Sequence, residues 1–241
     1  WGRPISHEEY EKATAGTWDV KLTPVKFVPH DWFGDLKGKR VLGLASGGGQ
    51  QMPIFAALGA KCTVLDYSEK QLESEHIVAQ REGYDITIVR ADMTKRLPFD
   101  DNSFDLIFHP VSNCYVYAVL PIWRECARVL KPGGQLLNFD ANWYGHLFDA
   151  EKRREYEEDR KHVEEQAMED HYIGTDIDEM EEIARNVPLS PVIRPAWDMK
   201  VLKNLGFQSV RTDEQVWQRV WSDTEKVNYA STPMFMIKAV K

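Results

Sequence analysis

Three consecutive glycines, Gly47, Gly48 and Gly49, follow a short apolar run at residues 41–45 and precede a helical pattern that begins at Met52. A tight turn between a buried strand and a helix brings backbone N–H groups and the positive helix end to one place, which suits a carboxylate or a phosphate. Glycines also remove the side chains that would keep a ligand from the backbone. A glycine turn can equally serve only to join a strand to a helix, so both interpretations stay open from this feature alone.

Two aspartates follow the next two predicted strands. Asp66 ends the second strand, where a carboxylate can accept hydrogen bonds from both hydroxyls of an adenosine ribose. Asp92 follows the third strand, within reach of an adenine amino group, and Met93 provides an apolar neighbour for the ring. The alternatives are a helix N-cap for Asp66, for which Ser68 is better placed, and a turn aspartate for Asp92. We therefore expect a nucleoside at this edge. It is not predicted to be a nicotinamide dinucleotide, because the fingerprint built on Gly47 and Gly49 requires glycine or alanine where Met52 stands.

Strands alternate with helices along most of the chain, which indicates a parallel sheet covered on both faces. Strands are predicted at 41–45, 62–66, 85–90, 104–108, 135–140, 209–217 and 233–240, and helices at 6–16, 52–58, 68–82, 119–130, 149–165, 176–187 and 198–205. The pattern breaks after residue 142, where a highly charged helical segment predicts an insertion.

The composition of the chain disfavours several classes of binding partner and location. The chain has 241 residues with 30 Lys and Arg against 38 Asp and Glu, a formal net charge of −8, which disfavours nucleic acid as a partner. No apolar run approaches the ~20 residues of a membrane span, and no signal-peptide pattern opens the chain, so we expect a cytoplasmic protein. Three widely spaced cysteines, Cys62, Cys114 and Cys126, indicate neither a disulfide framework nor a metal site.

Four motifs in order resemble the class I S-adenosylmethionine-dependent methyltransferases, in particular the subgroup that includes the ubiquinone and menaquinone C-methyltransferases. They are VLGLASGGGQ, VLDYS, RADM with LPFDDNSFDLIF, and ECARVLKPGGQLL, and they cover residues 38–140. The resemblance implies an α/β fold: a Rossmann-like, seven-stranded, mostly parallel sheet with helices on both faces, an antiparallel last strand and a helical insertion after the fifth strand.

The resemblance also implies S-adenosyl-L-methionine as the cofactor, with its methionine part on the turn 45–49 and its sulfonium near residues 109–111. It places the ribose on Asp66 and the adenine beside Asp92 and Met93. The expected cofactor-binding residues are Ala45, Ser46, Gly47, Gly49, Gln50, Asp66, Tyr67, Ser68, Asp92, Met93, His109, Pro110 and Val111.

This chain departs from the family pattern at two positions. The family usually has an acidic residue where Gly43 stands and a glycine where Ala45 stands. Without the acid, the cofactor's ammonium group lacks its usual partner. A polar side chain at Ser46, Gln50 or Gln51 is a candidate replacement.

Methyl transfer from a sulfonium depends mainly on alignment and requires a base only for a protonated acceptor. His109, which follows the fourth strand, is the candidate base or orienting residue, and a hydrogen-bonded wall residue is the alternative interpretation. Asn113 is a candidate for orienting the acceptor, and His146 is a weaker candidate base than His109. The HPVSN sequence does not match the N/D-P-P-Y/F motif of enzymes that methylate nucleic-acid amines.

We interpret residues 1–241 as a single methyltransferase domain. It divides into an N-terminal helical segment over the active site (1–37), a cofactor-binding core (38–141), a helical insertion or lid (142–196), and a closing helix with the last two strands (197–241). Aromatic residues that can line an acceptor pocket are Trp143, Tyr144, Tyr172 and Trp197. The expected function is methyl transfer to a small-molecule acceptor, and a homodimer is compatible with the sequence. The alternatives are a non-catalytic S-adenosylmethionine-binding protein and a nicotinamide-dependent oxidoreductase.

Overall fold

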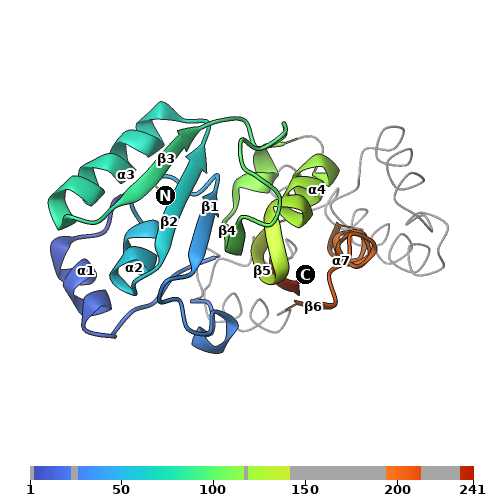
Figure 1. The fold of residues 1–241 in the computed structure, drawn as a ribbon, viewed down its shortest axis with the longest axis horizontal. Coiled ribbons are helices and arrows are strands. Elements are labelled where there is room, and N and C mark those ends of the chain that lie inside the picture. The colour runs from blue at the N-terminus through green and yellow to red at the C-terminus, as the bar shows by residue number, and fades with distance from the viewer. Residues whose placement is uncertain (1–2, 23–26, 117–118, 142–193, 213–233) are drawn as a thin grey trace, which may run out of the picture.

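The computed structural model describes residues 3–22, 27–116, 119–141, 194–212 and 234–241 (Figure 1). Its seven-stranded sheet has the order β3-β2-β1-β4-β5-β7-β6. The strands are β1 (Arg40–Leu44), β2 (Lys61–Asp66), β3 (Ile86–Arg90), β4 (Phe104–His109), β5 (Leu130–Ala141), β6 (Ser209–Thr212) and β7 (Met234–Val240). The helices are α1 (His7–Thr14), α2 (Met52–Ala57), α3 (Glu69–Glu82), α4 (Leu120–Val129) and α7 (Arg194–Asn204), with 3₁₀ turns η1 (His30–Trp32) and η2 (Ser112–Tyr115).

The first five strands pair in parallel, and β7 pairs antiparallel with both β5 and β6. The chain runs outward from β1 to β2 and β3, then returns to place β4 on the other side of β1. Ligands of open α/β sheets bind beyond the carboxyl ends of the strands at such a reversal. The predicted α/β fold, with its mostly parallel seven-stranded sheet, is therefore confirmed.

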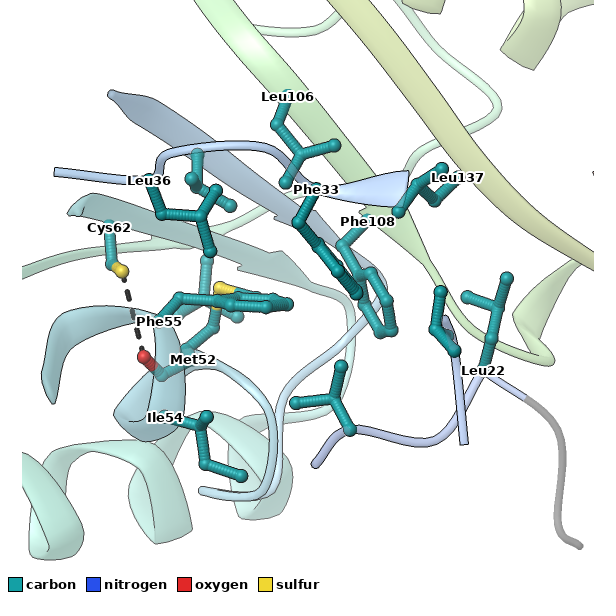
Figure 2. Packing of buried hydrophobic residues seen from close by; sticks show 14 of the residues in the cluster. Leu22, Phe33, Leu36, Met52, Ile54, Phe55, Cys62, Leu106, Phe108 and Leu137 are labelled. Atoms are coloured by element: carbon teal, nitrogen blue, oxygen red, sulfur yellow. Dashed lines mark hydrogen bonds between the residues drawn. The ribbon is translucent and has the colours of Figure 1, made fainter. Parts of the chain in front are cut away.

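Hydrophobic clusters cover both faces of the sheet. On one face Phe55 of α2 packs against Phe33 and Phe108, with ring centroids 5.6 and 5.2 Å away (Figure 2). On the other face Trp123 of α4 is fully buried, and its indole N–H donates to the carboxylate of Asp198 on α7 at 2.7 Å. Burial on both faces explains why the strands are continuously apolar in sequence.

The turns that bound the elements follow local chemistry. Ser6 and Glu9 form a reciprocal capping box at the start of α1, and Ser68 caps α3 by accepting the N–H of Gln71. Strand β5 begins at Leu130, earlier than the predicted residue 135, because Leu130 already pairs with Phe104 of β4. The prediction of that boundary was wrong because a Pro-Gly-Gly sequence usually marks a turn outside a strand.

Several predictions lie outside the described residues. They are the helices at 149–165 and 176–187, the part of the strand at 209–217 beyond Thr212, and the residues Trp143, Tyr144, His146 and Tyr172. Trp197 belongs to α7, but its side chain is also outside the described part. In the part that is described, no helix combines the length and the apolar character needed to cross a bilayer.

Candidate functional site

A cavity of about 850 Å³ lies at the carboxyl ends of β1 to β4. Of the residues predicted to bind a cofactor, all except Gly49 and His109 line it. Its walls are Ala45, Ser46, Gly47, Gln50, Gln51, Leu65, Asp66, Tyr67, Ser68, Gln71, Ala91, Asp92, Met93, Thr94, Lys95, Pro110, Val111, Ser112, Val116 and Pro121. Residues far apart in the sequence therefore meet at the edge where the sheet order reverses.

Asp66 is fixed by two backbone bonds. Its Oδ2 accepts the N–H of Gly47 at 3.0 Å, and its Oδ1 accepts the N–H of Ser68 at 2.9 Å. A carboxylate accepts about four hydrogen bonds, so both oxygens keep capacity for a ligand in the cavity. The side chain is only partly buried. Asp66 is thus placed to receive two hydroxyl groups at once.

The glycine turn is packed too tightly for side chains. A Cβ on Gly47 would lie 2.9 Å from the Cβ of Gln71 and 3.1 Å from Oδ2 of Asp66. Gly48 has φ +118°, and a Cβ there would lie 2.6 Å from Oε1 of Gln71. The turn therefore brings bare backbone to the cavity wall, which fits a ligand lying flat against it.

The N–H groups of the three glycines all donate within the protein. Gly47 donates to Asp66, Gly48 to the carbonyl of Gln71 at 3.0 Å, and Gly49 to Oε2 of Glu75 at 2.8 Å. The sequence suggested that these amides bind an anionic group of the ligand. The amides are instead used within the protein: Gly47 binds the end of β2, and Gly48 and Gly49 dock the turn on α3.

Asp92 and Met93 follow β3 and line the cavity. Oδ1 of Asp92 accepts the backbone N–H and the hydroxyl of Thr94 at 2.8 and 2.7 Å. These hydrogen bonds, the hydroxyl first, hold the pKa of Asp92 below its usual value. The carboxylate is therefore ionised at neutral pH and can accept from an amino group, while Met93 gives an apolar surface.

Two non-glycine residues of the cavity wall have left-handed backbones. Ala45 has φ +48° and Val111 has φ +54°. Such a conformation costs roughly 1–2 kcal/mol for a residue with a Cβ. The hydroxyl of Ser112 donates to the carbonyl of Ala45 at 2.6 Å and ties the two strained segments together. The family's usual glycine at position 45 is explained by this backbone.

The space of the family's usual acid is filled by Met52. A Cβ on Gly43 would lie 2.7 Å from the sulfur of Met52 and 2.9 Å from its methyl carbon. Met52 is fully buried beside Phe55, as Figure 2 shows. A side chain at position 43 therefore requires the buried side chain of Met52 to move or to be replaced by a smaller one.

Neutral side chains line the cavity near Gly43. The Ser46 hydroxyl donates to Oε1 of Gln51 at 3.3 Å, and the Gln51 amide lies 3.5 Å from Oε1 of Gln50. Gln50 in turn donates to the carbonyl of Arg3 at 3.0 Å. This chain of hydrogen bonds fixes amide and hydroxyl groups at the cavity wall and connects them to the N-terminal segment.

His109 and Asn113 lie outside the cavity lining. His109 is fully buried, and its Nδ1 lies 2.7 Å from the carbonyl oxygen of Leu44. Because a carbonyl only accepts, Nδ1 carries the proton of this bond. Asn113 is also buried and donates to Oδ1 of Asn138 at 3.2 Å. Both side chains bind elements that support the cavity, and their catalytic roles stay predictions.

Sequence reasoning missed Glu75. Its carboxyl group is fully buried and accepts the N–H of Gly49. Burial is the largest influence on the pKa of Glu75 and raises it to about 7. One sequence signal was present, since Glu75 stands three residues from both Leu72 and Val78, on the buried stripe of α3. An acid on an apolar helix face is a candidate buried carboxyl group.

Metal coordination has no geometric basis in the described residues, where no three His, Cys, Asp or Glu side chains form a group that could hold an ion. Cys62 and Cys126 are buried free thiols, and burial raises the pKa of Cys62 to about 12. These thiols are therefore protonated at neutral pH.

The fold and the cavity define an α/β domain with a pocket at the carboxyl ends of its parallel strands, and comparison with known proteins shows which proteins it resembles. Residues 42–138 match the family model described as "Methyltransferase domain". The predicted resemblance to S-adenosylmethionine-dependent methyltransferases is confirmed.

Particular relatives agree with this family. The chain is 48% identical over 151 residues to "Uncharacterized methyltransferase YbaJ" of Bacillus subtilis (strain 168). The aligned residues cover 63% of this chain and 59% of that protein. It is 40% identical over 103 residues to the demethylmenaquinone methyltransferase of Clavibacter sepedonicus, covering 42% of this chain and 40% of that one. The chain thus spans less than two thirds of these relatives.

A solved structure agrees on the fold over most of the chain. The S-adenosylmethionine-dependent methyltransferase from Mesorhizobium loti superposes with a TM-score of 0.57 at 18% identity, covering 88% of this chain and 94% of that one. At this identity the likeness concerns the fold.

Proposed function

We propose that the protein transfers a methyl group from S-adenosyl-L-methionine to a small-molecule acceptor by in-line displacement. The observation that carries this proposal is Asp66, a carboxylate fixed by two backbone amides at the strand-order reversal and facing a cavity lined by bare glycine backbone. When bound, S-adenosylmethionine supplies an electrophilic methyl group on a sulfonium. The residues of this chain bind and orient it.

The nucleoside half of the cofactor fits the side of the cavity that holds Asp66 and Asp92. Asp66 would accept the two ribose hydroxyls, and Asp92 would accept from the adenine amino group. Met93 offers an apolar surface to the ring. This assignment uses the remaining acceptor capacity of carboxylates that backbone and hydroxyl donors already orient.

The methionine half then points toward Ser46, Gln50 and Gln51, since these residues line the other side of the cavity. Gln50 and Gln51 would accept from the ammonium group through their amide oxygens. A neutral amide oxygen binds an ammonium less strongly than a carboxylate does, because it carries no net negative charge to attract the cation.

Alignment is the chemical task that these walls would perform. Holding the reacting atoms in line can supply about 7–11 kcal/mol of the barrier reduction. Pro110, Val111 and Ser112 line the cavity after β4, and the bond from Ser112 to Ala45 fixes that wall against the end of β1. His109 supports the same wall through the carbonyl of Leu44, and we assign it an orienting role.

Two features of the sequence, its net charge and the HPVSN segment, favour a small molecule as the methyl acceptor. A net charge of −8 disfavours a polyanion, and HPVSN lacks the motif that holds a nucleic-acid amine. The N-terminal segment and the insertion are the expected acceptor walls.

Calorimetry with S-adenosylhomocysteine tests the cofactor assignment. Asp66→Ala should weaken binding by about 1–3 kcal/mol because the ribose hydroxyls lose a charged acceptor. Asp100→Ala, at an exposed aspartate away from the cavity, is the matched control and should bind as wild type. An unchanged dissociation constant for Asp66→Ala would contradict the site.

Turnover separates an enzyme from a binding protein. S-adenosylhomocysteine production is measured with mixtures of small phenols, amines, thiols and activated-carbon acceptors. Release above the acceptor-free rate supports the transferase. Tight cofactor binding without turnover on any class supports the non-catalytic alternative.

A further inference from the structure

Glu75 is a buried acid that the proposed reaction does not use. It lies on α3, its side chain is fully buried, and its Oε2 accepts the N–H of Gly49 at 2.8 Å. Its Oε1 lies 3.5 Å from the hydroxyl of Tyr84. Burying a carboxylate is costly unless it is well bonded, so this position carries a penalty that an apolar residue would avoid.

The carboxyl group of Glu75 contacts the glycine turn at residues 47–49. Gly48 donates to the carbonyl of Gln71, and one helical turn later Glu75 accepts from Gly49. Gln71 itself lines the cavity. Glu75 is therefore one of two acceptors on α3 that set the conformation of the turn.

Gly49 is tightly packed on both sides. Its φ is +68°, and a Cβ there would lie 2.6 Å from Val78 and 3.3 Å from Pro4. Its carbonyl accepts the N–H of Ile5 at 2.8 Å. The glycine is held between α3 and the N-terminal segment, so the Glu75 bond fixes a junction of three elements.

We propose that Glu75 is a positioning residue of the cofactor cavity, whose carboxylate holds the glycine turn through Gly49 and whose negative charge favours a cationic ligand over a neutral one. The inference rests on the proposed function for the identity of that ligand, S-adenosylmethionine. The product, S-adenosylhomocysteine, lacks the sulfonium charge and is the matched neutral probe.

The groups that face Glu75 decide how it titrates. Asp66 at the end of β2 raises its pKa, and the Gly49 N–H and the Tyr84 hydroxyl lower it, while burial has the largest influence. Cys62 on β2 and Tyr10 on α1, which stacks on Tyr84, have raised pKa values and are neutral near pH 7. With a pKa of about 7, Glu75 ionises in the neutral range. A cation in the cavity should promote that ionisation.

The central experiment measures binding of both ligands by calorimetry from pH 5.5 to 8.5. In the wild type, affinity for S-adenosylmethionine should rise about threefold to tenfold across the range, and affinity for S-adenosylhomocysteine should change less. Glu75→Gln keeps an oxygen for Gly49 but cannot ionise, so its profile for S-adenosylmethionine should be flat. Glu73→Gln, at an exposed glutamate of the same helix, is the control and should follow the wild type.

Two further variants separate charge from general destabilisation. Tyr84→Phe removes a hydrogen bond that lowers the pKa of Glu75, so the midpoint of the wild-type profile should move to higher pH. Glu75→Ala removes the acceptor of Gly49 and should weaken both ligands about tenfold or more. If Glu75→Ala does not fold, Glu75→Gln and Tyr84→Phe still decide the question.

The outcomes distinguish this inference from the proposed function. Equal pH profiles for wild type and Glu75→Gln would overturn the charge role of Glu75 while leaving cofactor binding intact. Failure of the wild type to bind either ligand would contradict the proposed function instead. In that case hydrogen exchange of the Gly49 amide still tests the positioning role: faster exchange in Glu75→Ala than in Glu75→Gln supports it, and equal exchange overturns it.

Discussion

The two ends of the cavity differ in the chemistry they offer. At one end Asp66 and Asp92 present carboxylates that neighbouring amides and hydroxyls orient. At the other, Ser46 and Gln51 present neutral groups, and Ala45 adds a strained backbone. Under the proposed function, the charged end would bind the nucleoside and the neutral end would bind the methionine part. The neutral end is shaped by packing, because Met52 fills the place of a carboxylate.

The largest effect is expected when an acid is placed at the neutral end, which tests whether packing keeps that end neutral. Gly43→Asp should destabilise the fold by about 3 kcal/mol or more, because the new side chain meets Met52 and buries a charge. The free energy of unfolding in urea measures this. Gly43→Asp combined with Met52→Ala should recover part of the loss and strengthen S-adenosylhomocysteine binding. A single variant as stable as the wild type would contradict the packing argument.

The turn between the two ends gives a pH-dependent test. The pKa of Glu75 is raised from 4.5 to about 7 in the folded protein. Between pH 4.5 and pH 7 the folded protein therefore binds a proton at Glu75 that the unfolded chain does not. The stability that this proton contributes is complete below about pH 4.5 and is lost as the pH rises through about 7. Its size is up to about 3 kcal/mol.

Urea unfolding of wild type and Glu75→Gln from pH 4.5 to 8 measures that loss. The wild type should lose stability relative to the variant as pH rises. A constant difference between the two proteins would show that Glu75 does not titrate in this range.

The neutral end itself should have a modest effect on affinity. Gln51→Ala should weaken S-adenosylhomocysteine binding by about 1.5 kcal/mol, the lower value for a hydrogen bond to a charged group, because Gln50 keeps a second acceptor for the ammonium. It should leave 5′-methylthioadenosine unaffected, because that molecule lacks the amino-acid part. Calorimetry with both ligands checks this, and exposed Gln80→Ala is the control. Equal losses for both ligands would move Gln51 out of the methionine end.

The smallest effect concerns backbone strain. Ala45→Gly should stabilise the protein by up to about 1 kcal/mol, because glycine adopts φ +48° without strain and loses only part of this gain to chain entropy. Ala56→Gly, inside helix α2, should have the opposite sign at about 1 kcal/mol. Urea unfolding compares them. Destabilisation by both changes would rule out strain at Ala45.

The sequence predicted most of what is local. The apolar runs around Leu42 and Ile107 identified strands buried on both faces, and Ser6 with Glu9 identified a helix start. Asp66 was recognisable because a carboxylate at a strand end has few other roles. Glu75 was not recognised: its place on the apolar stripe of α3 indicates burial, but its bond to Gly49 depends on how the glycine turn packs on that helix.

The chemistry of this protein's cavity was decided at two levels. Residue order alone determined that strands and helices alternate and that Gly47 and Asp66 fall at the same sheet edge, because periodicity and turn chemistry act over short distances along the chain. Only the tertiary structure decided that the Gly48 and Gly49 amides bind α3, that Met52 fills the space beside Gly43, and that His109 supports a wall. These are contacts between distant segments, and their geometry depends on how helices and sheet pack together.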